Sequence, residues 1–122
     1  MLNDNLYIIN RFTDDGGKVN AAIQLDADHK IFEGHFPGQP VLPGVCMMQI
    51  IKELTEKATG KILFLNEAAQ CKFLSMVDPA KTPSLVAEID YQQPDAASVT
   101  VNAILKNETA TFFKINARLQ VV

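Results

Sequence analysis

The sequence predicts an α+β domain in which one long helix covers an antiparallel sheet of five or six strands. The chain has 122 residues, the usual length of one domain, so we expect a single domain over residues 1–122. Its residues are 48% hydrophobic and 20% charged, which excludes a disordered chain. Only one long segment has the spacing of an amphipathic helix, and strand-like segments separated by turns make up the rest.

A β-hairpin is expected at the start of the chain. Residues 6–12 (LYIINRF) and 18–25 (KVNAAIQL) are strand-like, and the turn cluster Asp-Asp-Gly-Gly at 14–17 separates them. A loop over residues 26–42 follows. Three prolines and three glycines fall within residues 34–44, and neither a helix nor a sheet tolerates that density.

The helix is expected from about Pro43 to Ala58. Proline is tolerated at the first helical position, and Gly60 is a suitable stop. Apolar residues recur at helical spacing on the face that should pack against the sheet: Met47, Ile50, Ile51, Leu54 and Ala58. Val45 and Cys46 point elsewhere, so the first turn is apolar nearly all round and we expect the N-terminal end of the helix to be buried.

The remaining segments are strand-like and are separated by polar or proline-containing turns. They span residues 62–77, 85–92, 99–104 and 111–122. The first of them is long enough for one bent strand or two shorter ones. Turns are expected at residues 78–83, at Pro94-Asp95 and at residues 106–108.

Composition excludes several classes of protein. A net charge of −3 argues against nucleic acid or an anionic membrane as the main partner. The sequence has no apolar run long enough for a transmembrane helix and begins with no visible secretory signal, so we expect a cytoplasmic protein. Cys46 and Cys71 are expected to be free thiols rather than a disulfide. Two cysteines and two histidines without paired spacing give no zinc signature, so no metal site is expected.

The informative stretch is residues 34–45, which read G-H-F-P-G-Q-P-V-L-P-G-V. It resembles the motif G-H-F-P-x-x-P-V-x-P-G-V of the β-hydroxyacyl-(acyl carrier protein) dehydratases, and every fixed position is present. Residues 26–34 and 65–79 resemble the flanking parts of that family more loosely. The resemblance implies a hot-dog fold, an antiparallel sheet wrapped around a central helix. It also implies at least a dimer, with an acyl chain in a tunnel between subunits and two sites that each use residues of both chains.

The resemblance also implies roles for individual residues. His35 would take the proton from C2 of a 3-hydroxyacyl thioester, for which a neutral imidazole is suited. Gly44 would offer its backbone N–H to the thioester oxygen at the positive end of the helix, although it has a simpler explanation as a loop glycine entering that helix. Phe36 and Val45, in the same motif, are expected to bind substrate. This acid–base chemistry requires no cofactor, and none is expected.

One position departs from the family. The helix carboxylate that follows the histidine by fourteen residues is replaced by Gln49, which can hold a water or hydroxyl but cannot transfer a proton. Four residues later, where the family often has glutamine, this chain has Glu53. We expect Gln49 within about 6–7 Å of His35 across a subunit interface. Glu53 could reach the substrate too, but it belongs to a polar stripe with Lys52 and Glu56, and such a stripe is usually a solvated helix face.

Three functions are compatible with these residues. The first is a 3-hydroxyacyl-thioester dehydratase that gives a trans-2-enoyl thioester in fatty-acid or related acyl biosynthesis. The second is a non-catalytic hot-dog subunit that binds an acyl thioester or completes a heterodimer, and the third is a hot-dog thioesterase. The thioester would be carried by acyl carrier protein or coenzyme A, because Lys72 remains beside Phe73 while the basic residues that often follow this phenylalanine are absent. We expect a homodimer or higher oligomer, joined by sheet edges and the helix N-terminal region, or a heterodimer with a related subunit.

Overall fold

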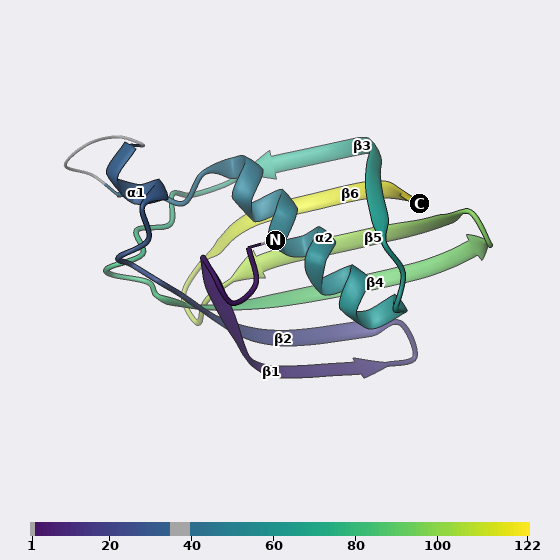
Figure 1. Ribbon diagram of the computed structural model, residues 1–122, viewed down its shortest axis with the longest axis horizontal. Coiled ribbons are helices and arrows are strands. Elements are labelled where there is room, and N and C mark those ends of the chain that lie inside the picture. The colour runs from purple at the N-terminus through teal and green to yellow at the C-terminus, as the bar shows by residue number, and fades with distance from the viewer. Residues whose placement is uncertain (1, 35–39) are drawn as a thin grey trace.

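One long helix lies across a six-stranded antiparallel sheet that curls around it (Figure 1). The computed structural model describes residues 2–34 and 40–122. The elements in chain order are β1 (Tyr7–Asp15), β2 (Lys18–Leu25), α1 (Ile31–Gly34), α2 (Gly44–Thr59), β3 (Leu63–Phe73), β4 (Ser84–Asp95), β5 (Ser98–Lys106) and β6 (Thr111–Val121). The strand order is β1-β2-β4-β5-β6-β3, so β1 and β3 form the two edges. The α+β class is confirmed.

The core lies between α2 and the sheet face that it covers. In β2, β4, β5 and β6 every second side chain is buried over much of the strand, as expected for strands with one face packed on a core. From α2 the buried apolar side chains are Cys46, Met47, Ile50, Ile51 and Leu54. The predicted apolar face of the helix is thereby confirmed, with Ala58 partly buried beside it.

The ends of α2 match the prediction to within one residue. Pro43 is the N-cap in an extended conformation, and the helix begins at Gly44. Gly60 ends the helix with φ 70°, in the left-handed region, and its N–H donates to the Glu56 carbonyl at 2.8 Å. The predicted burial of the first turn is only half right: Cys46 is buried, but the Val45 side chain is 73% exposed because it points away from the sheet.

Two turn predictions are corrected. The expected loop over 26–42 contains the short helix α1. β4 continues through Pro94 to Asp95, although a turn was expected there. The pairing of β4 with β5 shifts register between Gln92 and Asp95, so Pro94 lies where no regular ladder hydrogen bond is required.

The segment at 62–77 forms one strand rather than two. β3 spans Leu63–Phe73 and pairs with β6 throughout, with register shifts after Leu65 and after Ala68 that mark bulges. It ends earlier than expected because the backbone N–H groups of Leu74 and Ser75 both point to the Phe112 carbonyl, where the chain leaves the sheet.

Both cysteines are free thiols, as predicted. Cys46 is buried and Cys71 is partly buried, and burial raises the pKa of both thiols above the ordinary value. Within residues 2–34 and 40–122, no helix combines the length and the apolar character needed to cross a bilayer.

Candidate functional site

The N-terminus of α2 leaves two backbone donors free. The N-cap Pro43 has no side-chain hydrogen bond to the helix. Its carbonyl accepts from Cys46 N at 3.0 Å and Met47 N at 3.2 Å, which leaves the N–H groups of Gly44 and Val45 without an acceptor among the described residues. Unpaired N–H groups and the positive end of the helix dipole coincide here, so this end of α2 favours an oxygen that carries negative charge.

Gly44 is packed against an aromatic ring. A Cβ at this position would lie 2.6 Å from Cε1 and 2.8 Å from Cζ of Phe73. The Phe73 ring is stacked on Phe113, with ring centroids 5.0 Å apart, and a Cβ at position 44 would have to displace it from that stack. The absence of a side chain at Gly44 therefore has a packing cause that neither sequence interpretation of this glycine included.

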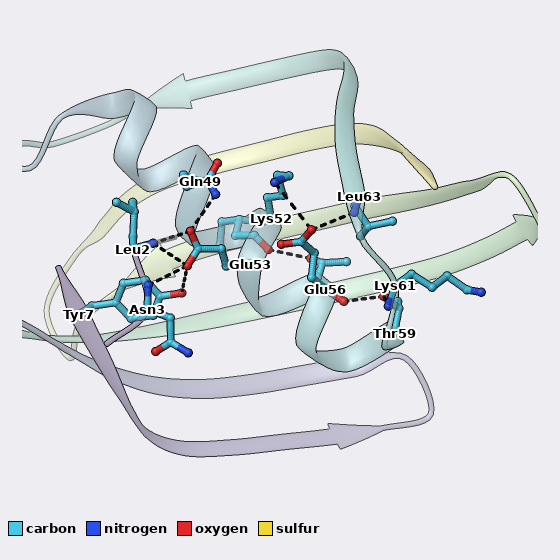
Figure 2. Close-up of polar contacts among 12 residues, drawn as sticks. Leu2, Asn3, Tyr7, Gln49, Lys52, Glu53, Glu56, Thr59, Lys61 and Leu63 are labelled. Carbon is cyan, nitrogen blue, oxygen red and sulfur yellow. Dashed lines mark hydrogen bonds and ion pairs between the residues drawn. The ribbon is translucent and has the colours of Figure 1, made fainter. Parts of the chain in front are cut away.

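Gln49 and Glu53, one turn apart on the same helix face, are hydrogen-bonded to each other. Gln49 Nε2 donates to Glu53 Oε2 at 2.8 Å. Figure 2 shows the Gln49 amide nitrogen turned toward Glu53 and its oxygen turned away. Among the described residues no donor bonds to that oxygen, and Gln49 is half-buried. Gln49, which stands where the family has a carboxylate, thus directs its amide oxygen away from Glu53.

Glu53 is a buried carboxylate, which corrects the expectation of a solvated polar stripe. The residue is 4% exposed. It accepts from the backbone N–H of Asn3 at 2.8 Å, from that of Leu2 at 2.9 and 3.1 Å, and from the Tyr7 hydroxyl at 3.1 Å (Figure 2). The N-terminal segment, residues 2–7, folds over α2 and supplies these donors, and this cover excludes water from the carboxylate.

Hydrogen bonding decides the charge state of Glu53. Burial alone raises the pKa of this carboxyl, but hydrogen bonds from Leu2, Gln49, Asn3 and Tyr7 favour the ionised form, and the net result is a pKa below the ordinary value. The pKa of Tyr7 is raised strongly, first by burial and then by the negative charge of Glu53. Glu53 is therefore an ionised acceptor and Tyr7 a neutral donor at neutral pH.

The rest of the polar stripe behaves as predicted. Lys52 and Glu56 form an i,i+4 ion pair at 3.7 Å with both side chains partly exposed. Glu56 also accepts from the backbone N–H of Leu63 at 2.9 Å, which fixes the start of β3. The stripe thus contains a partly exposed ion pair, Lys52 and Glu56, and a buried carboxylate, Glu53.

The predicted site residues fall into three groups. Gln49 and Glu53 are brought together, and Gly44 and Val45 lie at the start of the same helix. His35 and Phe36 lie outside the described residues, so the predicted distance between His35 and Gln49 remains a prediction.

Sequence reasoning missed Tyr7, Phe73 and the backbone donors of the N-terminal segment. Tyr7 stands between Leu6 and Ile8, and a tyrosine among apolar neighbours signals a buried hydroxyl that needs a partner. No pattern could have revealed the backbone donors, because every residue except proline carries one.

Four exposed apolar side chains belong to the first turn of α2 and to the end of β3. Val45, Phe73, Leu74 and Met76 are between 50% and 73% exposed, and we call them the apolar rim. The contact between Gly44 and Phe73 brings these two segments together, and Figure 1 shows the end of β3 beside the start of α2. Exposed apolar groups gathered in one place are typical of an interaction surface.

Sequence comparisons identify the relatives of this chain. The family model for the ApeI-like dehydratases matches residues 11–112. The 3-hydroxyacyl-[acyl-carrier-protein] dehydratase FabZ of Levilactobacillus brevis is 26% identical over 102 residues, which cover 78% of this chain and 69% of the relative. FabZ of Rickettsia conorii is 31% identical over 97 residues, covering 73% and 67% of the two chains.

Solved structures share the fold. A chain of the dehydratase heterocomplex ApeI:P from Xenorhabdus doucetiae superposes with a TM-score of 0.74 at 20% identity, covering 93% of this chain and 96% of that one. A mutant thioesterase of Pseudomonas aeruginosa gives a TM-score of 0.65 at 15% identity, covering 93% and 81%. The curled sheet around α2 is therefore the hot-dog fold, as the motif implied. Because the family model matches far more than half of the sequence, the chain belongs to the ApeI-like dehydratase family.

Proposed function

We propose that this chain binds a 3-hydroxyacyl thioester and takes part in the elimination of water from it, which gives a trans-2-enoyl thioester. The single observation that carries the proposal is the pair of N–H groups at the start of α2, at the end of the dehydratase motif, for which residues 2–34 and 40–122 supply no acceptor. Elimination begins with loss of the C2 proton, and the charge that develops on the thioester oxygen needs such donors. Family membership supports the same reaction class.

The roles of the residues follow from this chemistry. His35 takes the C2 proton, an acid from a second subunit gives a proton to the C3 hydroxyl, and the C3–O bond breaks to release water. The N–H groups of Gly44 and Val45 bind the thioester oxygen, and the close approach of Phe73 keeps position 44 free of a side chain. Phe36, next to His35 in the motif, and the Val45 side chain contact the acyl group. Gln49 contacts the C3 hydroxyl but cannot supply the proton.

The missing acid favours assembly with a second, related subunit. In this family each site combines the histidine loop of one chain with the helix of the other, so a homodimer of this chain would have glutamine in both sites. A partner that keeps the carboxylate would complete the site that contains His35. The structurally similar ApeI:P is a dehydratase heterocomplex, which supports assembly with a second subunit. The apolar rim and the free edge of β3 are the surfaces on which we expect the second subunit to pack.

A second candidate function has its own support. The hydrogen bond between Gln49 and Glu53 holds an amide, not an acid, at the family's carboxylate position. A subunit built in this way could bind the thioester without reacting. The carrier in either case is acyl carrier protein, as in the names of the FabZ relatives, or coenzyme A, which is bound in a structurally similar thioesterase of Streptococcus pneumoniae. We place the protein in the cytoplasm. Both carriers occur there, and its reducing conditions keep thiols such as Cys46 and Cys71 free.

The deciding assay uses 3-hydroxyacyl and trans-2-enoyl thioesters and follows dehydration, hydration and thiol release separately, with the chain alone and with candidate partner subunits. Dehydration that His35→Ala abolishes, in a variant that still folds, supports the proposal. Thiol release without an enoyl product indicates a thioesterase. Binding without any reaction in every combination supports the non-catalytic subunit.

The acid can also be supplied by mutation. Gln49→Glu places a second carboxyl beside Glu53, which its other donors hold ionised, so the proton should remain on residue 49 at neutral pH. We expect dehydration to rise by about 10²–10⁴-fold, the usual contribution of general acid–base assistance. The double variant Gln49→Glu/Glu53→Gln restores the family's order and is the matched comparison. No gain in either variant contradicts a site that lacks only its acid.

Assembly is tested by substituting the apolar rim. Sedimentation of the purified chain at micromolar concentration should give at least a dimer, and Val45→Lys should dissociate it. Ile62→Lys is the matched control, since Ile62 is 71% exposed but lies beyond the opposite end of β3. A compact monomer of about 13.4 kDa contradicts the homodimer and favours an obligate partner.

A further inference from the structure

We propose that Glu53 is a positioning residue that fixes the Gln49 amide with its oxygen toward the substrate, so that the site selects ligands that offer a hydroxyl donor at C3. The inference deepens the proposed function and rests on it. A primary amide can present either its oxygen or its NH2 group to a ligand by rotating half a turn. The group that faces the ligand is the one that is not hydrogen-bonded to the protein. In this chain the NH2 group of Gln49 is hydrogen-bonded to Glu53.

Glu53 leaves the amide one orientation. An ionised carboxylate only accepts hydrogen bonds, so an amide oxygen turned toward it would place two acceptors at about 2.8 Å, the distance now occupied by Gln49 Nε2 and Glu53 Oε2. The NH2 group therefore faces Glu53 and the oxygen faces the other way (Figure 2).

Glu53 itself cannot turn away from Gln49. Oε1 accepts from Asn3 N, Leu2 N and the Tyr7 hydroxyl, and Oε2 accepts from Leu2 N as well as from Gln49. Both oxygens are thus held by the N-terminal segment, and the carboxylate is 4% exposed. Rotation of the carboxylate would break hydrogen bonds to partly buried N–H groups and to the buried Tyr7 hydroxyl, which is costly.

The N-terminal segment is also tied to the chain just before the dehydratase motif. The N–H of Ile31 donates to His29 Nδ1 at 3.0 Å, so His29 carries its proton on Nε2 and donates it to Asn5 Oδ1 at 2.9 Å. Residues 2–7 therefore support both Glu53 on α2 and the approach to the loop that contains His35. The orientation of Gln49 is built into the fold rather than left to the ligand.

The chemical consequence is a preference at C3 of the acyl chain. A 3-hydroxyacyl thioester offers an O–H to the Gln49 oxygen, whereas a 3-oxoacyl thioester of the same length offers only an acceptor. Glu53→Gln reverses the arrangement. The oxygen of the new amide at position 53 takes the place of Oε1, where it meets the donors of Asn3 and Tyr7 and the longer bond from Leu2, and its NH2 group takes the place of Oε2 and faces Gln49. The Gln49 amide must in turn point its oxygen toward the NH2 group at position 53 and its own NH2 group toward the ligand.

The test measures a ratio of affinities, which a loss of folded protein does not change. Calorimetry gives the Kd of non-hydrolysable amide analogues of 3-hydroxybutyryl- and 3-oxobutyryl-coenzyme A for the parent chain, Glu53→Gln and Glu56→Gln. Glu56→Gln is the matched control, because it makes the same change one turn away without contact to Gln49. We expect Glu53→Gln to shift the ratio toward the oxo ligand by about tenfold, since a donor replaces an acceptor at one hydrogen bond, and Glu56→Gln to leave it unchanged.

A second readout needs no ligand. The side-chain NH2 resonances of Gln49, identified by their loss in Gln49→Ala, should exchange with solvent more slowly in the parent than those of exposed glutamines, and should lose this protection in Glu53→Gln. Unprotected NH2 protons in the parent overturn the inference. Binding of both analogues with a ratio that Glu53→Gln leaves unchanged overturns it too. Failure of the parent to bind either analogue, whether it is carried by coenzyme A or by acyl carrier protein, instead defeats the proposed function, and the acceptor role of Gln49 with it.

Discussion

Glu53 and Glu56 are the same residue type, three positions apart on one helix, yet their side chains lie in very different environments. Glu53 is buried at 4% exposure and accepts from a segment about 50 residues away in sequence. Glu56 keeps a side-chain exposure of 17%, pairs with Lys52 on its own helix and accepts from Leu63 only seven residues on. Both carboxylates project from the same helix. Whether such a polar residue is buried or stays on the surface is decided by the chain segments that pack over it.

Truncation of the two carboxylates should give the largest contrast. Glu53→Ala removes the acceptor of the partly buried backbone donors of Leu2 and Asn3 and of the buried Tyr7 hydroxyl, so the free energy of unfolding should fall by about 2–4 kcal/mol. Glu56→Ala removes one accessible hydrogen bond and should cost about 1 kcal/mol. Urea unfolding measures both, and equal losses would contradict the buried network.

Acid should reveal the contribution of the ionised Glu53 carboxylate. The folded-state pKa of Glu53 is below its ordinary value of 4.5, so its contribution to stability is present above that pH and is lost as pH falls through the lowered pKa. Glu53→Gln should therefore flatten the loss of stability below about pH 4. The measurement is the free energy of unfolding from about pH 7 to about pH 2. Parallel curves for parent and Glu53→Gln would show that Glu53 is not stabilised as an anion.

Removal of one hydroxyl should have a smaller effect. Tyr7→Phe deletes a single donor to Glu53 while three others remain, and should cost about 1 kcal/mol. Tyr91→Phe is the matched control: its hydroxyl donates to Asp14 at an exposed site, where the loss should be within about 0.5 kcal/mol. Thermal unfolding of both variants checks the difference, which should vanish for Tyr7→Phe in a Glu53→Ala background.

The smallest effect on stability is expected for the partly exposed ion pair between Lys52 and Glu56. Lys52→Ala breaks a partly exposed ion pair and should lower the free energy of unfolding by about 0.3 kcal/mol, a difference that disappears in about 1 M salt. The contrast between parent and Glu53→Ala should persist in the same salt, because solvent ions do not reach a buried carboxylate. Unfolding at two salt concentrations distinguishes the two cases.

Local signals were sufficient for several elements. The strand at 18–25 was predicted to its last residue, because strict alternation is bounded by a glycine turn on one side. The ends of α2 were predicted because Pro43 and Gly60 each act through their own backbone conformation. The spacing of Gln49 and Glu53 placed them on one helix face, and their hydrogen bond agrees with that geometry.

Signals that depend on distant partners were missed. Glu53 was assigned to a solvated face because nothing near it in sequence shows that residues 2–7 cover it. Gly44 was explained by its loop or by the reaction, whereas the ring that excludes a Cβ belongs to Phe73, 29 residues later. Val45 was expected inside because its neighbours are apolar, but the single chain leaves it uncovered. In each case the cause is a tertiary contact that local pattern does not encode.

The strand order has a consequence for how the chain matures during synthesis. β3 follows α2 directly, but in the sheet it pairs only with β6. A nascent chain that has just left the ribosome up to β5 would therefore carry β3 with both of its edges open, next to a helix whose apolar face is already made. Such an unpaired strand invites pairing with other chains. The interval before residues 111–121 emerge is thus when this protein is most exposed to aggregation, and when a chaperone would be most useful to it.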